Sequence, residues 1–168
     1  MILICYDGSP DSQSAIEHAG ELLSGQPATV LTVWEPFIEV VTRNTYGFGI
    51  FPGSINVEEI DAASRQGAEA RAQEGAELAG KAGLKAQPRT RSQLTTVANT
   101  ILSEAEAVSA TAIVMGSRGR TGVKSVLLGS VSHGVIQHAD RTVVVVPSPE
   151  VSAARDRSRH AAEGRRNT

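Results

Sequence analysis

Short runs of aliphatic and β-branched residues alternate with longer segments of helical character along most of this chain, and that alternation limits the folds it can adopt. Five runs are typical of strands, at residues 2–6, 29–34, 84–91, 111–115 and 142–146. Between them, amphipathic or helix-favouring segments predict helices that begin near residues 10, 57, 96 and 131. Parallel strands need crossovers of about a dozen residues or more, which are usually helical. The sequence therefore predicts an α/β fold, a doubly wound open sheet of five parallel strands with helices on both faces.

Capping residues mark the ends of these helices. Ser9 followed by Pro10 suits a helix start, and Thr96 or its neighbour Thr95 offers another. Gly83 follows a long segment rich in alanine and glutamate, at a position where glycine commonly ends a helix.

Two stretches do not fit the alternation. Residues 35–56 hold aromatic side chains interrupted by glycines and prolines with no sustained period, and we interpret them as a long loop. Residues 149–168 carry five arginines and almost no apolar side chains, which predicts a flexible arginine-rich tail after a domain at 1–148. A helical extension held by a partner is the alternative for the tail.

Composition narrows the class of protein. The 168 residues have a formal net charge of −2, so no general positive field is available to hold nucleic acid. No apolar run approaches the roughly 20 residues of a membrane span, and the first residues lack the features of a secretory signal. The one cysteine cannot form an internal disulfide. We therefore expect a cytoplasmic domain that contacts neither nucleic acid nor a membrane.

The feature richest in chemistry is a set of glycines between the fourth strand and the last helix. Gly116, Gly119 and the pair Gly129-Ser130 form the pattern G-x2-G-x9-G-S. Glycine lets backbone N–H groups converge on an anion without a side-chain clash. Ser130 adds a hydroxyl at a helix N-terminus, where unpaired N–H groups and the helix dipole favour negative charge. The pattern therefore predicts a phosphate-binding loop.

Two better-known phosphate loops do not match this segment. A Walker loop needs glycine directly before Lys-Ser, whereas Val123 precedes Lys124-Ser125 here. The dinucleotide pattern G-x-G-x-x-G is absent from the sequence. The loop belongs to a different class.

With these features the chain resembles the universal stress proteins of the ATP-binding kind over about residues 1–147. The glycine-spaced motif 116–130 matches that family's nucleotide signature, and Asp7, Val33 and the Val-Met-Gly run at 114–116 match its other ligand positions. The resemblance implies a fold like that of the adenine nucleotide alpha hydrolases.

The resemblance also implies roles for single residues. Asp7 and Val33 would contact ribose and adenine, and Met115 and Gly116 would line the base and sugar. The phosphates would be held by Gly119, Gly129, Ser130 and Val131. Mg²⁺ or Mn²⁺ would bridge phosphate oxygens, because no dedicated carboxylate cluster is visible in the sequence.

Several candidate residues have a second interpretation. Asp7 also suits an Asx turn with the residues that follow it. Arg118, which flanks Gly119, is a candidate phosphate ligand or an ordinary solvated loop side chain. His133 and His138 are five residues apart, which does not suit two metal ligands on one helix face. Cys5, within a strand, reads as a small core residue rather than a nucleophile.

Three functions are compatible with these features. The leading hypothesis is an ATP-binding module for stress response or signalling, in which occupancy controls a homodimer or the surface offered to an unknown protein partner. The second is an enzyme, at most a slow Mg²⁺-dependent ATPase, for which Asp7 is the one candidate general base in the sequence, although a contact with sugar or metal suits it better. The third is a nucleotide-free dimeric scaffold. In the resembled family the strand Thr142–Val146 pairs with its copy in a second subunit, so the resemblance implies a symmetric homodimer.

Overall fold

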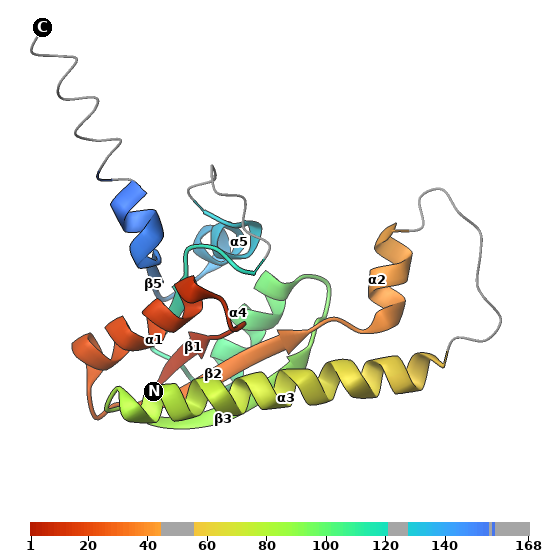
Figure 1. Ribbon diagram of the computed structural model, residues 1–168, viewed down its shortest axis with the longest axis horizontal. Helices are drawn as coiled ribbons and strands as arrows, with labels where there is room; N and C mark the ends of the chain where they lie inside the picture. The colour runs from red at the N-terminus through yellow and green to blue at the C-terminus, as the bar shows by residue number, and fades with distance from the viewer. Residues whose placement is uncertain (45–55, 121–127, 155, 157–168) are drawn as a thin grey trace, which may run out of the picture.

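The sheet has the predicted architecture. The computed structural model describes residues 1–44, 56–120, 128–154 and 156. Its five strands are β1 (Ile2–Cys5), β2 (Pro27–Trp34), β3 (Lys85–Ser92), β4 (Ala112–Gly116) and β5 (Thr142–Val146). They lie in the order β3-β2-β1-β4-β5, and each neighbouring pair is parallel (Figure 1). The doubly wound parallel sheet is therefore confirmed.

Helices cover both faces of this sheet. The covering helices are α1 (Pro10–Leu23), α3 (Val57–Lys81), α4 (Val97–Ala107) and α5 (Ser130–His138), whereas α2 (Phe37–Asn44) packs mainly against α3. One buried cluster joins α1 and α3 to the sheet through Ile16, Ala76 and Ile4. A second joins α4 and α5 to the other face through Ile101, Val135 and Leu3. Aliphatic residues and alanines thus form a core on each side of the central strand.

The predicted caps are present where the structure describes them. The Ser9 hydroxyl accepts a hydrogen bond from the Ser12 N–H at 3.2 Å, and the Thr96 hydroxyl accepts one from the Asn99 N–H at 3.1 Å. Gly83 has a φ of 91°, in the left-handed region that favours glycine, directly after α3. Local sequence therefore fixes these helix ends.

The interpretation of residues 35–56 as one long loop was wrong for its first part, because α2 begins directly after Pro36. The Phe37 N–H donates to the Asp61 carboxylate on α3 at 2.6 Å, and the Glu39 N–H donates to the Pro36 carbonyl at 3.0 Å. The first N–H group of this helix has its hydrogen-bond acceptor on another helix, so the local sequence pattern does not reveal the helix start. Residues 45–55 lie outside the described part of the chain.

The predicted tail begins as a helix, at residues 149–154. The Ser152 N–H donates to the Ser148 carbonyl at 3.0 Å, and Val151 is buried with 8% of its surface exposed. Ser148 as a cap and Val151 as an apolar anchor explain why order continues past 148. Residues 155 and 157–168 lie outside the described part, so flexibility there stays a prediction.

A buried glutamate ties α4 to the edge strand β3. Glu104 has only 4% of its side chain exposed, and its two carboxylate oxygens form ion pairs with Arg89 and Arg91. The Arg91 Nε lies 2.6 Å from the carboxylate. The two arginines remain 39% and 43% exposed. Two partly exposed arginines on β3 therefore neutralise the charge of the buried carboxylate.

An arginine closes the C-terminal end of α4. Arg141 donates from its guanidinium to the carbonyl oxygens of Ala105 at 2.9 Å and Ala110 at 2.8 Å. Carbonyl groups at a helix C-terminus lack intrahelical partners, and a cation there also interacts favourably with the helix dipole.

Among the described residues, no helix is both long and apolar enough to cross a membrane.

Candidate functional site

A cavity of about 330 Å³ opens at the carboxyl edge of the sheet, around the end of β1. Its neighbours β2 and β4 lie on opposite sides of β1, so the chain changes direction of winding at this point. Ligands of open α/β sheets bind at such positions. All nine residues predicted for the site line this cavity: Asp7, Val33, Met115, Gly116, Arg118, Gly119, Gly129, Ser130 and Val131.

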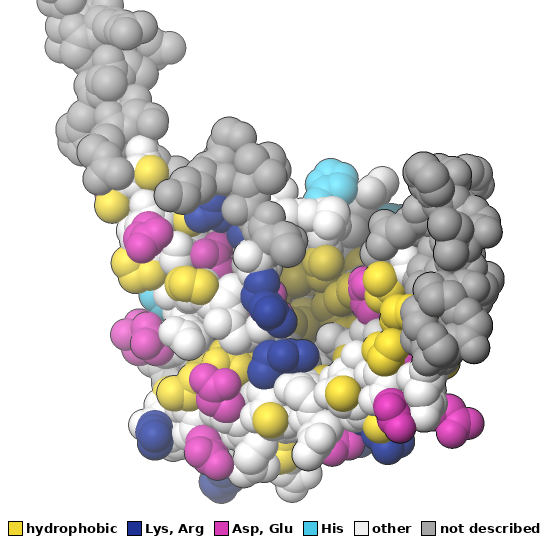
Figure 2. Space-filling view, turned by 45° about the vertical axis from the view of Figure 1, so that its right-hand side comes forward, with side chains coloured by type: hydrophobic (Ala, Val, Ile, Leu, Met, Phe, Trp, Pro, Cys, Tyr) yellow, Lys and Arg dark blue, Asp and Glu magenta, His cyan; other side chains and the backbone are white. Residues whose placement is uncertain are grey.

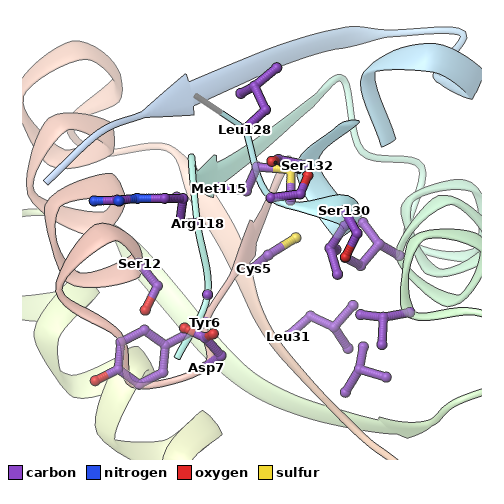
Figure 3. Close-up of a pocket in the computed structure, with 17 residues that line it drawn as sticks. Cys5, Tyr6, Asp7, Ser12, Leu31, Met115, Arg118, Leu128, Ser130 and Ser132 are labelled. Carbon is purple, nitrogen blue, oxygen red and sulfur yellow. Dashed lines mark hydrogen bonds between the residues drawn. The ribbon is translucent and has the colours of Figure 1, made fainter. Parts of the chain in front are cut away.

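One end of the cavity is apolar. Leu31, Val33, Ile101 and Met115 line it, together with the thiol of Cys5. Figure 2 shows the hollow with hydrophobic side chains on its floor and positively charged side chains along one edge. In Figure 3, Cys5, Leu31 and Ser130 come from three different elements around the same space. A flat apolar ring suits this floor.

The other end holds the N-terminus of α5. Gly129 occupies the cap position with a φ of −70° and makes no side-chain cap hydrogen bond. The exposed Ser130 is the first residue of the helix, and both it and Val131 line the cavity. The first N–H groups of a helix have no partner within it, and the helix dipole is positive at that end. This end of the cavity is therefore suited to an anion.

The two ends of the glycine-spaced loop are joined by Ser117. Its carbonyl accepts hydrogen bonds from the Gly129 N–H and the Ser132 hydroxyl, each at 2.8 Å, and its own N–H donates to the Val146 carbonyl at 2.8 Å. The N–H of Gly129 thus has a partner within the protein. Ser130 and Val131 are better placed to donate from their backbones than Gly129. Residues 121–127 of the loop lie outside the described part of the chain.

The Asx turn that is one interpretation of Asp7 is present, and its contact with a ligand stays a prediction. One carboxylate oxygen accepts from the Ser9 N–H at 3.0 Å, which is the Asx turn, and the other accepts from the Arg120 N–H at 3.1 Å. The residue is half-buried and also lines the cavity. Asp7 therefore ties the loop after β1 to the start of the glycine-spaced loop.

The three motif glycines have different reasons to be glycine. A Cβ on Gly119 would lie 2.8 Å from the Asp7 carboxylate, and one on Gly116 would lie 2.7 Å from Cβ of Asp11. A Cβ on Gly129 would meet nothing closer than 3.5 Å. Packing within the described residues explains the first two glycines but not the third.

Sequence reasoning missed Asp11. This residue lies in the first turn of α1 and is 5% exposed, and its carboxylate accepts from the Ser117 hydroxyl at 2.7 Å and from the Arg118 N–H at 3.1 Å. Acidic residues are common in the first turn of any helix. The sequence around Asp11 therefore gives no signal that it reaches across the fold to Ser117.

Two other candidates from the sequence, Arg118 and His138, form contacts within the protein. Arg118 lines the cavity, but Figure 3 shows its side chain directed toward α1, where it forms an ion pair with Asp11 at 3.8 Å. His138 bonds through Nδ1 to the Gly134 carbonyl on its own helix. Across the described ranges, no three histidine, cysteine, aspartate or glutamate side chains gather as a metal site would require.

Cys5 should be unreactive although it faces the cavity. Burial in apolar surroundings, and then the nearby charge of Asp7, raise the pKa of its thiol from 9.0 to about 12. Because the thiolate is the nucleophile, iodoacetamide at pH 8.5 should alkylate folded protein at least about tenfold more slowly than urea-unfolded protein. Mass spectrometry over time measures both rates. Equal rates would show that the thiol is not shielded.

The raised pKa also has a consequence for stability. The folded state favours the neutral thiol, so this contribution is complete below pH 9 and is lost as the pH rises from 9 towards about 12.

Comparison with known proteins places the chain in a family by sequence. The model of the "Universal stress protein family" matches residues 48–147. The universal stress protein YxiE of Bacillus subtilis is 29% identical over 150 residues, which cover 86% of this chain and 97% of that protein. The universal stress protein MJ0531 of Methanocaldococcus jannaschii is 47% identical over 53 residues, only 32% of this chain and 31% of that protein.

Solved structures agree with the fold. Hypothetical protein MJ0577 superposes with a TM-score of 0.69 at 23% identity, over 87% of this chain and 94% of that one. A universal stress protein solved with cAMP gives 0.58 at 19% identity, over 88% and 95%. One from Archaeoglobus fulgidus, solved with dAMP, gives 0.55 at 20% identity, over 86% and 95%. With the family model covering more than half of its residues, this chain belongs to the universal stress protein family.

Proposed function

We propose that this protein binds an adenine nucleotide, with ATP as the ligand, in the cavity at the end of β1. The observation that carries the proposal is the convergence of all nine predicted residues on one cavity that is apolar at one end and holds an open helix N-terminus at the other. Relatives of the same fold have been solved with cAMP and dAMP. The base would lie on the floor formed by Val33 and Met115, and the phosphates at Ser130 and Val131.

A divalent cation would be held through the phosphates. The described residues offer no cluster of three metal-ligating side chains, and Mg²⁺ is commonly bound by substrate phosphates with few protein ligands. Mg²⁺ or Mn²⁺ would there neutralise charge between neighbouring phosphate oxygens.

Binding rather than hydrolysis is the function that Asp7 favours. Both of its carboxylate oxygens accept hydrogen bonds from backbone N–H groups. A general base must be positioned for the attacking water, whereas these two oxygens hold the loop after β1 against the start of the glycine-spaced loop. We therefore place slow ATP hydrolysis second and a nucleotide-free scaffold third.

We further propose that nucleotide occupancy controls a homodimer or a surface for a protein partner, as a signal in the stress response of the cytoplasm. β5 is an edge strand whose outer backbone groups have no neighbouring strand among the described residues. Such an edge is a natural position for strand pairing with a second copy. Only three residues separate α5 from β5. A ligand bound at the start of α5 would therefore contact the helix that directly precedes the edge strand.

Replacing Ser130 by alanine tests the phosphate end. Loss of one hydrogen bond to a charged group should weaken ATP about tenfold and leave adenosine unchanged, because only ATP carries phosphates. Isothermal titration with ATP in the presence of Mg²⁺, and with adenosine, measures both affinities. Gly119→Ala is a poorer test because its Cβ would displace the Asp7 carboxylate.

The matched control is Ser103→Ala, at an exposed serine on α4 that does not line the cavity. It should bind both ligands like the unsubstituted protein. Absence of heat with ATP, together with no competition by AMP, would exclude the proposed function. An equal loss of ATP and adenosine in Ser130→Ala would place the phosphates elsewhere.

A further inference from the structure

We propose that Asp11 positions the phosphate end of the site: it lies behind the cavity and fixes the start of the glycine-spaced loop, although it is not among the described residues that line the cavity. The inference rests on the proposed nucleotide function. Its neighbour Ser12 does line the cavity, so Asp11 acts from directly behind the wall.

Burial makes Asp11 unusual. Carboxylates are seldom buried unless they are paired, and this one is 5% exposed. It lies in the first turn of α1, where the helix dipole favours its charge. An ordinary N-terminal aspartate obtains the same benefit at the surface, so the dipole alone does not explain burial. The reason must lie in what the carboxylate contacts.

Its partners Ser117 and Arg118 are the residues directly after β4. One oxygen, Oδ2, accepts from the Ser117 hydroxyl at 2.7 Å and from the Arg118 N–H at 3.1 Å, and lies 3.8 Å from the Arg118 guanidinium. Ser117 in turn holds the Gly129 N–H through its carbonyl. The carboxylate thus fixes one end of the loop directly and the other through a single residue.

Gly116 completes this arrangement. A Cβ at that position would lie 2.7 Å from the carbonyl carbon and Cβ of Asp11, and 2.8 Å from the Ser12 nitrogen. Glycine therefore lets the first turn of α1 rest on the end of β4, which brings the carboxylate to Ser117. The first glycine of the motif serves this contact between α1 and β4 as well as lining the cavity.

Two effects of Asp11 on a bound phosphate have opposite signs. Its hydrogen bonds hold Ser117 and Arg118 in place, which favours binding, whereas its negative charge repels phosphate and keeps the Arg118 guanidinium turned toward α1. Positioning should outweigh repulsion, because Oδ2 of the carboxylate accepts two hydrogen bonds and lies 3.8 Å from the Arg118 guanidinium.

Two substitutions separate these effects. Asp11→Ala removes both hydrogen bonds and should weaken ATP about tenfold while leaving adenosine unchanged. Asp11→Asn also removes the negative charge, but it keeps an oxygen that can accept from Ser117 and Arg118. This variant should therefore retain most of the ATP affinity. Titration calorimetry with ATP and Mg²⁺ and with adenosine measures this. Tighter ATP binding by both variants, or an equal loss of adenosine, would overturn the inference.

A second measurement needs no nucleotide. The amide hydrogen of Arg118 is bonded to Asp11, so its exchange with solvent should accelerate at least about tenfold in Asp11→Ala and much less in Asp11→Asn. Unchanged exchange in Asp11→Ala would overturn the positioning role. If the unsubstituted protein bound neither ATP nor adenosine, the proposed function would fail while this exchange still decided the role of Asp11.

Arg141→Ala is the control for general loss of stability. It removes two hydrogen bonds to the carbonyl groups at the end of α4, and Arg141 does not line the cavity. This variant should melt at a lower temperature yet keep its ATP affinity and the slow exchange of Arg118. A matching loss of ATP affinity would attribute the Asp11→Ala result to stability and overturn the inference.

Discussion

A tryptophan at position 33 should abolish the binding of both ATP and adenosine while the protein stays folded. Val33 lies near the carboxyl end of β2, is half-buried and lines the apolar floor of the cavity. An indole ring at this position would occupy the space proposed for adenine and bury its own apolar surface there. Since both ligands share the base, we expect each affinity to fall more than about 100-fold, which corresponds to about 2.7 kcal/mol.

Titration calorimetry measures both affinities, and thermal unfolding checks the fold. Leu94→Trp is the matched control, because Leu94 is 57% exposed and does not line the cavity. That variant should bind both ligands normally. If Val33→Trp lost ATP but kept adenosine, the base would lie elsewhere and the apolar floor would need another occupant.

Removing both arginines beside Glu104 should destabilise the protein far more than removing Glu104 itself. In Arg89→Ala/Arg91→Ala, a carboxylate that is 4% exposed loses both cations. One-sided loss of a buried ion pair costs about 3–5 kcal/mol, and we expect about 3 because water would enter part of the space left by the half-exposed arginines. In Glu104→Met no charge stays buried, and the arginines can turn to solvent, so we expect about 1 kcal/mol or less.

Chemical denaturation of both variants, fitted for the free energy of unfolding, measures this asymmetry. Arg65→Ala serves as the control, because Arg65 pairs with Glu69 along one exposed helix face, where such pairs contribute little. Equal losses from the two sides of the Glu104 network would mean that the carboxylate is not effectively buried.

The local sequence pattern was enough to predict the strands and the helix ends that depend on neighbouring residues. The strands are short aliphatic runs, and the caps at Ser9 and Thr96 are decided by side chains within three residues. The family resemblance named Asp7, Val33 and Met115 as site residues. Topology explains why these residues, far apart in sequence, lie together, since the carboxyl ends of neighbouring parallel strands meet at one edge. Their contact with a nucleotide stays a prediction.

What the sequence did not reveal depends on contacts between distant elements. α2 begins where Asp61 of α3 accepts the Phe37 N–H, and no residue beside Phe37 carries that information. Asp11 reaches Ser117 across 106 positions. Val151 extends order past the predicted boundary because a single apolar side chain finds a buried place. In each case the deciding partner is known only after the chain has folded.

The hydrogen bond from Gly129 to Ser117 closes the glycine-spaced loop without depending on the length of the chain in its middle. That bond fixes the distance between Ser117 and Gly129 at the two ends of the loop. Doubling the length of a closed loop costs only about 0.6 kcal/mol of closure entropy. Insertions after residue 120 and before residue 128 should therefore be tolerated, because they leave the contacts of Arg118 with Asp11 and of Arg120 with Asp7 in place. An engineer could place a reporter peptide there without moving the start of α5.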